Sequence, residues 1–66
     1  MINEKLIDAI EQSGIKKSKI AEFMGISRHT LYNKINGNTK FTDSEIVAIA
    51  KCLRLTKAQT SSIFFD

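Results

Sequence analysis

Apolar residues recur every three or four positions along most of this 66-residue chain, the spacing of helices with one buried face. The first such segment is predicted to run from Glu4 to Ser13, with Asn3 as its N-cap and Gly14 just after its end. Its inward positions are Leu6, Ala9 and Ile10. Almost nothing along the chain indicates a strand, so the pattern predicts an all-α fold.

A glycine divides the next apolar stretch into two short helices. The second predicted helix stops at Gly25, and the third begins with Ser27 as its N-cap and stops at Gly37. A turn of about three residues between them lets the two helices cross at roughly 90–120°. The buried positions are Ile20, Ala21 and Met24 on the second helix and Leu31 and Ile35 on the third. The pattern therefore predicts a helix-turn-helix.

Two capping-box patterns predict where the remaining helices begin. Thr42 and Glu45 form one at the start of the fourth helix, and Thr56 and Gln59 form the other at the start of the fifth. The fourth helix is expected to turn Ile46, Ile49, Ala50 and Leu53 inward, with Val47 nearby, and the apolar residues of the fifth are Ile63, Phe64 and Phe65. The prediction is a compact bundle of about five short helices, in one domain that spans residues 1–66.

The net charge of +3 is unevenly distributed along the chain. Residues 1–14 carry a balance of −2 and residues 42–66 a balance of zero, whereas residues 15–41 carry +5. The basic residues of this middle block are Lys16, Lys17, Lys19, Arg28, Lys34 and Lys40, against Glu22 alone. Such a block indicates a polyanion as partner, and the alternative is a face that only keeps the domain in solution.

The composition argues against several other classes of protein. No apolar run reaches the ~18 residues that a membrane span needs. Acidic residues also interrupt the start, where a signal peptide would be apolar. We therefore expect a cytoplasmic protein with no membrane partner. Cys52 is expected to be a half-buried structural thiol rather than a nucleophile. Because no catalytic or metal-ligand set can be assembled, neither an enzyme nor a cofactor nor a metal is expected.

The segment IAEFMGISRHTLYNKING, together with IVAIAKCLRL, resembles the Cro and repressor type helix-turn-helix family of phage and bacterial transcription regulators. Ala21, Gly25 and Leu31 fall at the family's spacing. The chain also has a pattern similar to the family's fourth-helix signature, formed by Ile49, Ala50, Leu53 and Leu55. The resemblance covers about Leu6 to Leu55 and implies a lambda-repressor-like fold. It also implies binding to double-stranded operator DNA as a dimer, which represses a promoter by occluding it.

The resemblance further implies roles for the exposed residues of the third helix and its flanks. Base contacts are expected from Ser27, Arg28, His29, Tyr32 and Asn33. Phosphate contacts are expected from Lys16, Lys17, Ser18, Asn36, Asn38, Thr39 and Lys40. Ser27 and Tyr32 are divided between base and phosphate. The alternatives are a surface position without a role for His29 and packing against the domain for Tyr32.

Lys16 and Lys17 depart from the family, which usually has Thr or Ser followed by Gln at these positions. Two lysines at a helix N-terminus oppose the helix macrodipole, at a cost of about 0.3–1 kcal/mol each. Lys16 also has no side-chain oxygen with which to cap the helix. Two lysines that lower helix stability in this way are consistent with contact to phosphate. The same change replaces the usual Gln, whose side chain can contact a base in the family.

Phe23 occupies a family position that is usually polar and exposed. We expect it either to pack under the fifth helix or to belong to a contact surface, since surplus apolar area on a small domain marks an interface. The residues expected to support self-association or a protein partner are Phe23, Ile63, Phe64 and Phe65. The second functional hypothesis is accordingly a protein-binding regulator on the same fold, such as an antirepressor or an antitoxin.

Overall fold

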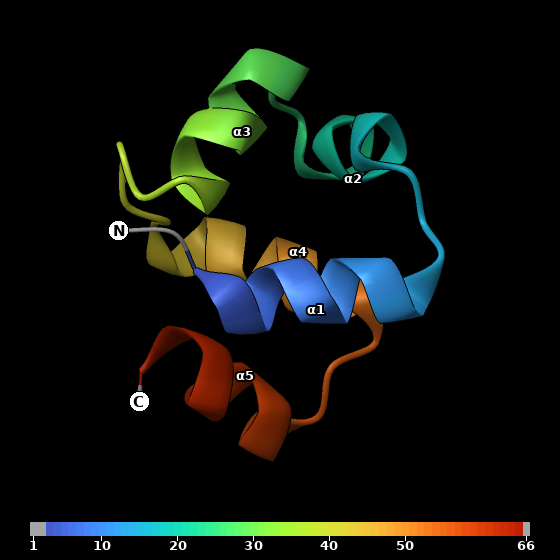
Figure 1. The fold of residues 1–66 in the computed structure, drawn as a ribbon, viewed down its shortest axis with the longest axis vertical. Coiled ribbons are helices and arrows are strands. Elements are labelled where there is room, and N and C mark those ends of the chain that lie inside the picture. Colours follow the sequence, from blue (N-terminus) through green and yellow to red (C-terminus); the bar gives the residue numbers. More distant parts are fainter. Residues whose placement is uncertain (1–2, 66) are drawn as a thin grey trace.

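The computed structural model describes residues 3–65, and within this range the chain forms α-helices and no strand (Figure 1). The helices are α1 (Glu4–Ser13), α2 (Lys17–Met24), α3 (Arg28–Ile35), α4 (Asp43–Leu53) and α5 (Lys57–Phe64). The predicted all-α, five-helix fold is therefore confirmed.

Most helix ends lie where the sequence predicts them because local capping groups hold them there. The exception is α3, which ends at Ile35 with Asn36 as its C-cap, two residues before the predicted stop at Gly37. The side-chain oxygen of Asn3 accepts a hydrogen bond from the backbone N–H of Leu6 at 3.0 Å, which caps α1. Thr42 and Thr56 begin α4 and α5 with complete capping boxes, as predicted. Gly25 ends α2 in the left-handed conformation, with φ +74°, which glycine adopts at least cost. These ends thus follow from residues close together in the chain.

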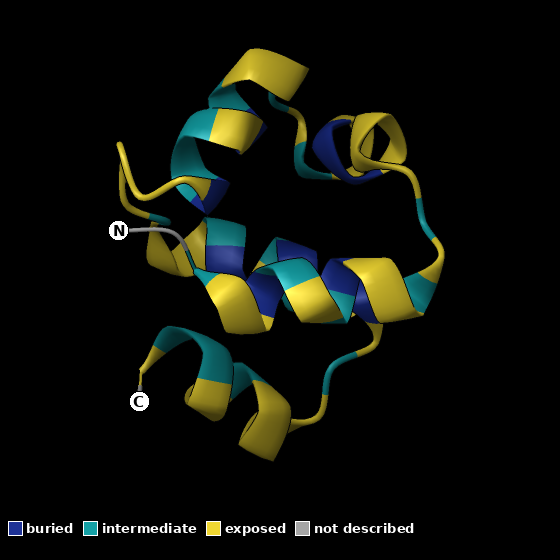
Figure 2. Cartoon of the chain, in the orientation of Figure 1, coloured by how far each residue is buried: buried dark blue, intermediate teal, exposed yellow. Residues whose placement is uncertain are grey.

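One side chain from each of the first four helices is fully buried at the centre of the fold. These residues are Leu6, Ile20, Leu31 and Ile49. Figure 2 shows the buried positions facing one another across the space that α1 to α4 enclose. Val47, which the pattern places near the inward positions of α4, is instead 54% exposed. It lies on the side of α4 that turns toward α5 rather than toward the core.

Helix α5 closes the bundle with no fully buried residue of its own. The Asn3 side-chain amide donates to the carbonyl of Ile63 at 3.1 Å, and the Lys5 ammonium donates to Ser62. The rings of Phe41 and Phe64 meet edge to face, with centroids 5.2 Å apart. Contacts to α1 and to the segment before α4 therefore hold α5 in place.

Candidate nucleic-acid interface

The turn between α2 and α3 brings the two helices into contact at a steep angle (Figure 1). The Ile26 amide donates to the carbonyl of Ala21 at 3.0 Å, which closes the turn behind Gly25. Ala21 itself is buried, as the helix-turn-helix pattern predicts. A new helix then starts at Ser27, whose hydroxyl accepts from the Thr30 amide at 3.1 Å. The predicted helix-turn-helix is present.

Helix α3 buries one side and presents the other to solvent. Leu31 and Ile35 anchor it in the core. The exposed residues include Arg28, His29 and Tyr32, while Asn33 is half-buried. The Ser27 hydroxyl is engaged in capping, and it also donates to the Thr30 hydroxyl at 2.9 Å. Arginine and asparagine side chains in such a row can form paired hydrogen bonds with guanine and adenine edges.

Tyr32 links α3 to the start of α2. The Lys17 ammonium lies 5.6 Å from the centroid of the Tyr32 ring, within the range of a cation–π contact. The tyrosine remains 38% exposed, so it packs against the lysine without leaving the surface. The preceding residue, Lys16, occupies the N-cap position of α2 and makes no side-chain capping bond. The N-terminus of α2 thus presents two cations beside α3.

The segment after α3 folds back onto Asn33. The backbone amides of Asn38 and Thr39 both donate to the Asn33 carbonyl, at 2.8 and 3.3 Å. The Asn38 side-chain amide also donates to the Asn33 side-chain oxygen at 3.4 Å. An amide oxygen can accept two hydrogen bonds, so this contact is compatible with a further bond from Asn33 to a base. Residues expected to contact phosphate are in this way held beside one expected to contact bases.

Lys34 has a different role from the other cations of the basic block. Its ammonium lies 2.8 Å from the carboxylate of Glu45 on α4, and both side chains are largely buried, with exposures of 9% and 19%. It also donates to the carbonyl of Lys40 at 3.0 Å. This hydrogen-bonded ammonium is the main reason that the pKa of Glu45 is lowered, and a hydrogen bond from the Thr42 amide adds to the effect. Lys34 therefore links α3 to α4 within the fold and is not part of the exposed basic surface.

The remaining cations of the block lie on exposed positions of α2, α3 and the segment after α3. Lys19 lies 3.9 Å from Glu22 in an exposed pair within α2. No ion pair within residues 3–65 involves the other four, which are Lys16, Lys17, Arg28 and Lys40. Ser18, Asn36, Asn38 and Thr39 are exposed as well. The exposed residues of the helix-turn-helix and its flanks thus carry an excess of positive charge.

The four apolar residues expected to support association differ in how far they are exposed. Phe23 is 56% exposed on α2, so it does not pack under α5. Ile63 and Phe64 are partly buried and pack against the core, because α5 has no other large apolar side chains with which to cover it. Phe65, at the end of α5, is 67% exposed. Of the expected association set, Phe23 and Phe65 are thus the two residues exposed to a partner, and their role in association stays a prediction.

Other candidate chemistry is limited. Cys52 is half-buried on α4, as predicted, and burial raises the pKa of its thiol. Among residues 3–65, no three His, Cys, Asp or Glu side chains lie close enough together to hold a metal ion. None of the helices formed by these residues is long and apolar enough to cross a bilayer.

Comparison with known protein families finds a match to the family described as bacterial regulatory protein, Fis family, over residues 3–36. These residues are just over half of the chain and comprise α1, α2 and α3, so they contain the whole helix-turn-helix. No curated protein and no solved structure matches the chain. The narrower resemblance to the Cro and repressor type stays a prediction. The chain belongs to the Fis family of bacterial regulatory proteins and is a DNA-binding transcription regulator of the helix-turn-helix type.

Proposed function

We propose that this chain is a sequence-specific regulator of the Cro and repressor type, which inserts α3 into the major groove of an operator and occludes a promoter. The observation that carries the proposal is the exposed row on α3, flanked by the lysines of α2 and by Lys40. A recognition helix of this kind reads bases with its N-terminal residues while the preceding helix contacts the backbone.

In this arrangement the side chains divide into two sets. Arg28 and Asn33 read base edges, since they are the residue types that bind guanine and adenine bidentately. His29, Ser27 and Tyr32 complete the base-proximal set, with Ser27 and Tyr32 also near the backbone. The phosphate contacts come from Lys16, Lys17, Ser18, Asn36, Asn38, Thr39 and Lys40. Phosphate contacts fix the register of the domain on the duplex and carry no sequence information themselves.

The regulator acts as a dimer on a two-fold symmetric operator. One copy measures 27 × 23 × 21 Å, whereas half-sites on successive major grooves lie about 34–36 Å apart. A single α3 therefore reads one half-site, and two copies are needed for the second.

The alternative is a protein-binding regulator on the same fold, an antirepressor or an antitoxin. The observation that favours it is the exposure of Phe23, whose ring lies on α2 with 56% of its surface in solvent. In that case Phe23 contacts a protein partner, and α3 contributes little binding energy to DNA.

The deciding experiment selects bound duplexes from a random DNA pool at two salt concentrations and sequences them. A motif that survives the higher salt supports sequence-specific reading, and two-fold symmetry in the motif supports the dimer. Retention without enrichment that collapses with salt indicates contacts to phosphate alone, and this outcome contradicts the proposal.

A further inference from the structure

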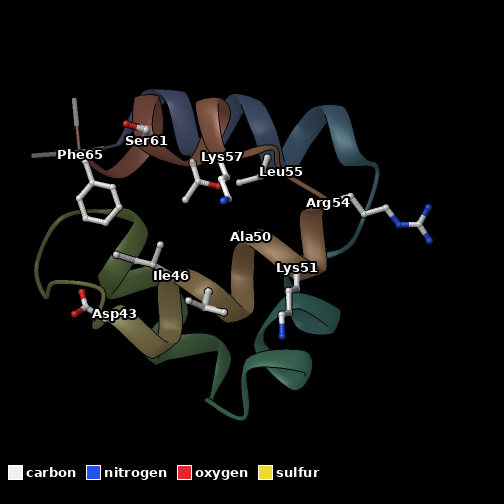
Figure 3. Close-up of a pocket in the computed structure, with 11 residues that line it drawn as sticks. Asp43, Ile46, Ala50, Lys51, Arg54, Leu55, Lys57, Ser61 and Phe65 are labelled. Carbon is white, nitrogen blue, oxygen red and sulfur yellow. The ribbon is translucent and has the colours of Figure 1, made fainter.

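An apolar groove runs between α4 and α5, and none of its lining residues belongs to α3 (Figure 3). Its volume is about 650 Å³, and its apolar lining includes Ile46, Val47, Leu55 and Phe65. Residues 54–56 connect the end of α4 to the start of α5, and the two helices run in roughly opposite directions (Figure 1). At ~1.5 Å per residue, α4 provides a groove about three turns long.

Charge is distributed unequally along this groove. Lys51, Arg54 and Lys57 lie toward the end where α4 passes into α5, and Asp43 lies at the opposite end (Figure 3). The rim thus has three basic side chains and one acidic side chain. All four are exposed, so they are available to a molecule that enters the groove.

The shape and the charge disfavour a second copy of this chain as the occupant. In a two-fold symmetric contact the same patch meets itself, so two concave grooves would face each other with a hollow between them. The excess of positive charge on each rim would also be brought together. A convex, acidic element fits both features better.

We propose that the α4–α5 groove binds an amphipathic helix of a partner protein, whose apolar ridge enters the groove and whose acidic residues meet Lys51, Arg54 and Lys57. Helices commonly dock in this way, through residues spaced at i, i+3, i+4 and i+7. The partner helix lies in the groove beside α4 and α5, with its apolar ridge between them. Because no residue of α3 lines the groove, the partner can bind the chain together with DNA, and the inference does not depend on how α3 reads DNA.

The test uses synthetic helical peptides of about 15 residues, a length close to four helical turns. One carries leucines at i, i+3, i+4 and i+7 with glutamates beside them, and a second has lysine at every glutamate position. A third keeps the composition of the first but scrambles the leucine spacing. Fluorescence anisotropy of labelled peptide measures affinity, and NMR amide shifts locate the contact. We expect the acidic peptide to bind at least tenfold more tightly than the other two and to shift α4 and α5 resonances.

Variants of the chain make the test specific. The double variant Lys51→Glu, Lys57→Glu should reverse the preference and favour the lysine peptide. Val47→Glu places a charge in the apolar lining and should abolish binding, whereas Ala58→Glu, exposed on α5 outside the groove, adds the same charge and should not. Circular dichroism checks the fold of each variant, and binding to DNA should be unchanged in Val47→Glu. Equal affinity for all peptides, equal effects of the two glutamate variants, or a dimer that Val47→Glu dissociates would overturn the proposal.

Discussion

The ammonium of Lys34, in the last turn of α3, lies 2.8 Å from the carboxylate of Glu45, in the first turn of α4. The same carboxylate accepts from the Thr42 amide at 2.9 Å and so closes the capping box of α4. Lys34 in turn donates to the Lys40 carbonyl and lies over the Phe41 ring at 5.9 Å. One ion pair therefore joins α3, the segment that follows it and the start of α4.

Removing the ammonium of Lys34 should destabilise the fold. In Lys34→Met the aliphatic stem remains while Glu45 loses its main partner, so we expect a loss of about 1–3 kcal/mol in the free energy of unfolding. Urea denaturation followed by circular dichroism measures it. Lys19→Met is the matched control, because the Lys19–Glu22 pair is highly exposed and longer, at 3.9 Å. There we expect about 0.5 kcal/mol or less. Equal losses in the two variants would contradict the internal role of Lys34.

The lowered pKa of Glu45 predicts a loss of stability in acid. Its pKa is below the ordinary value of 4.5 in the folded chain, so the unfolded chain binds the proton first as pH falls. The stability that ionised Glu45 contributes is complete above the ordinary value of 4.5, and it is lost as pH falls through the lowered pKa of the folded chain. Glu45→Gln lacks this titration, so the difference in unfolding free energy between the native chain and the variant should shrink between neutral pH and about pH 3. A difference that stays constant over this range would argue against the assignment.

Two substitutions on α3 test base reading. Arg28→Ala and Asn33→Ala should each weaken binding to the selected operator by about 1–3 kcal/mol and relax the preference at one base position. Electrophoretic mobility shifts on single-base operator variants measure both effects. Lys57→Ala removes a cation from α5 and should leave affinity and preference as they are. Unchanged operator affinity in both α3 variants would favour the protein-binding alternative.

Lys17 tests the phosphate contacts separately. Lys17→Ala should weaken binding by a similar factor on every DNA sequence and reduce the slope of log K against log salt by about 1. Titrations at four or more salt concentrations give this slope. A specific loss at one base position, with the slope unaltered, would show that Lys17 reads a base instead.

Arg54 predicts a stabilising substitution. It ends α4 with φ +56°, a left-handed conformation that costs a residue with a Cβ about 1 kcal/mol. Arg54→Gly should therefore raise the free energy of unfolding by about 0.5–1 kcal/mol, after the greater chain entropy of glycine is deducted. Thermal denaturation provides the comparison. Lys51→Gly, within the helical part of α4, should lower stability by about 1 kcal/mol. A loss in both variants would mean that Arg54 makes contacts that outweigh its backbone strain.

The helices and their ends could be predicted from the order of residues because the controlling interactions are local. A capping box joins residues three positions apart, as in Thr42 and Glu45, and Gly25 relieves a backbone conformation at its own position. The spacing of Ala21, Gly25 and Leu31 likewise places the helix-turn-helix, which the structure contains and the family match covers.

The surface depends instead on how the helices pack. Charge along the chain assigns Lys34 to the basic block, but the fold brings the end of α3 beside the start of α4 and so places Lys34 against Glu45, eleven residues away. The apolar residues at the end of the chain suggest a patch, but α5 turns Ile63 and Phe64 inward and leaves Phe65 exposed. The α4–α5 groove likewise depends on how these two helices are placed, because its lining comes from both of them. Periodicity reveals which residues share a helix face, whereas the partners of that face depend on crossing angles that packing between distant segments sets.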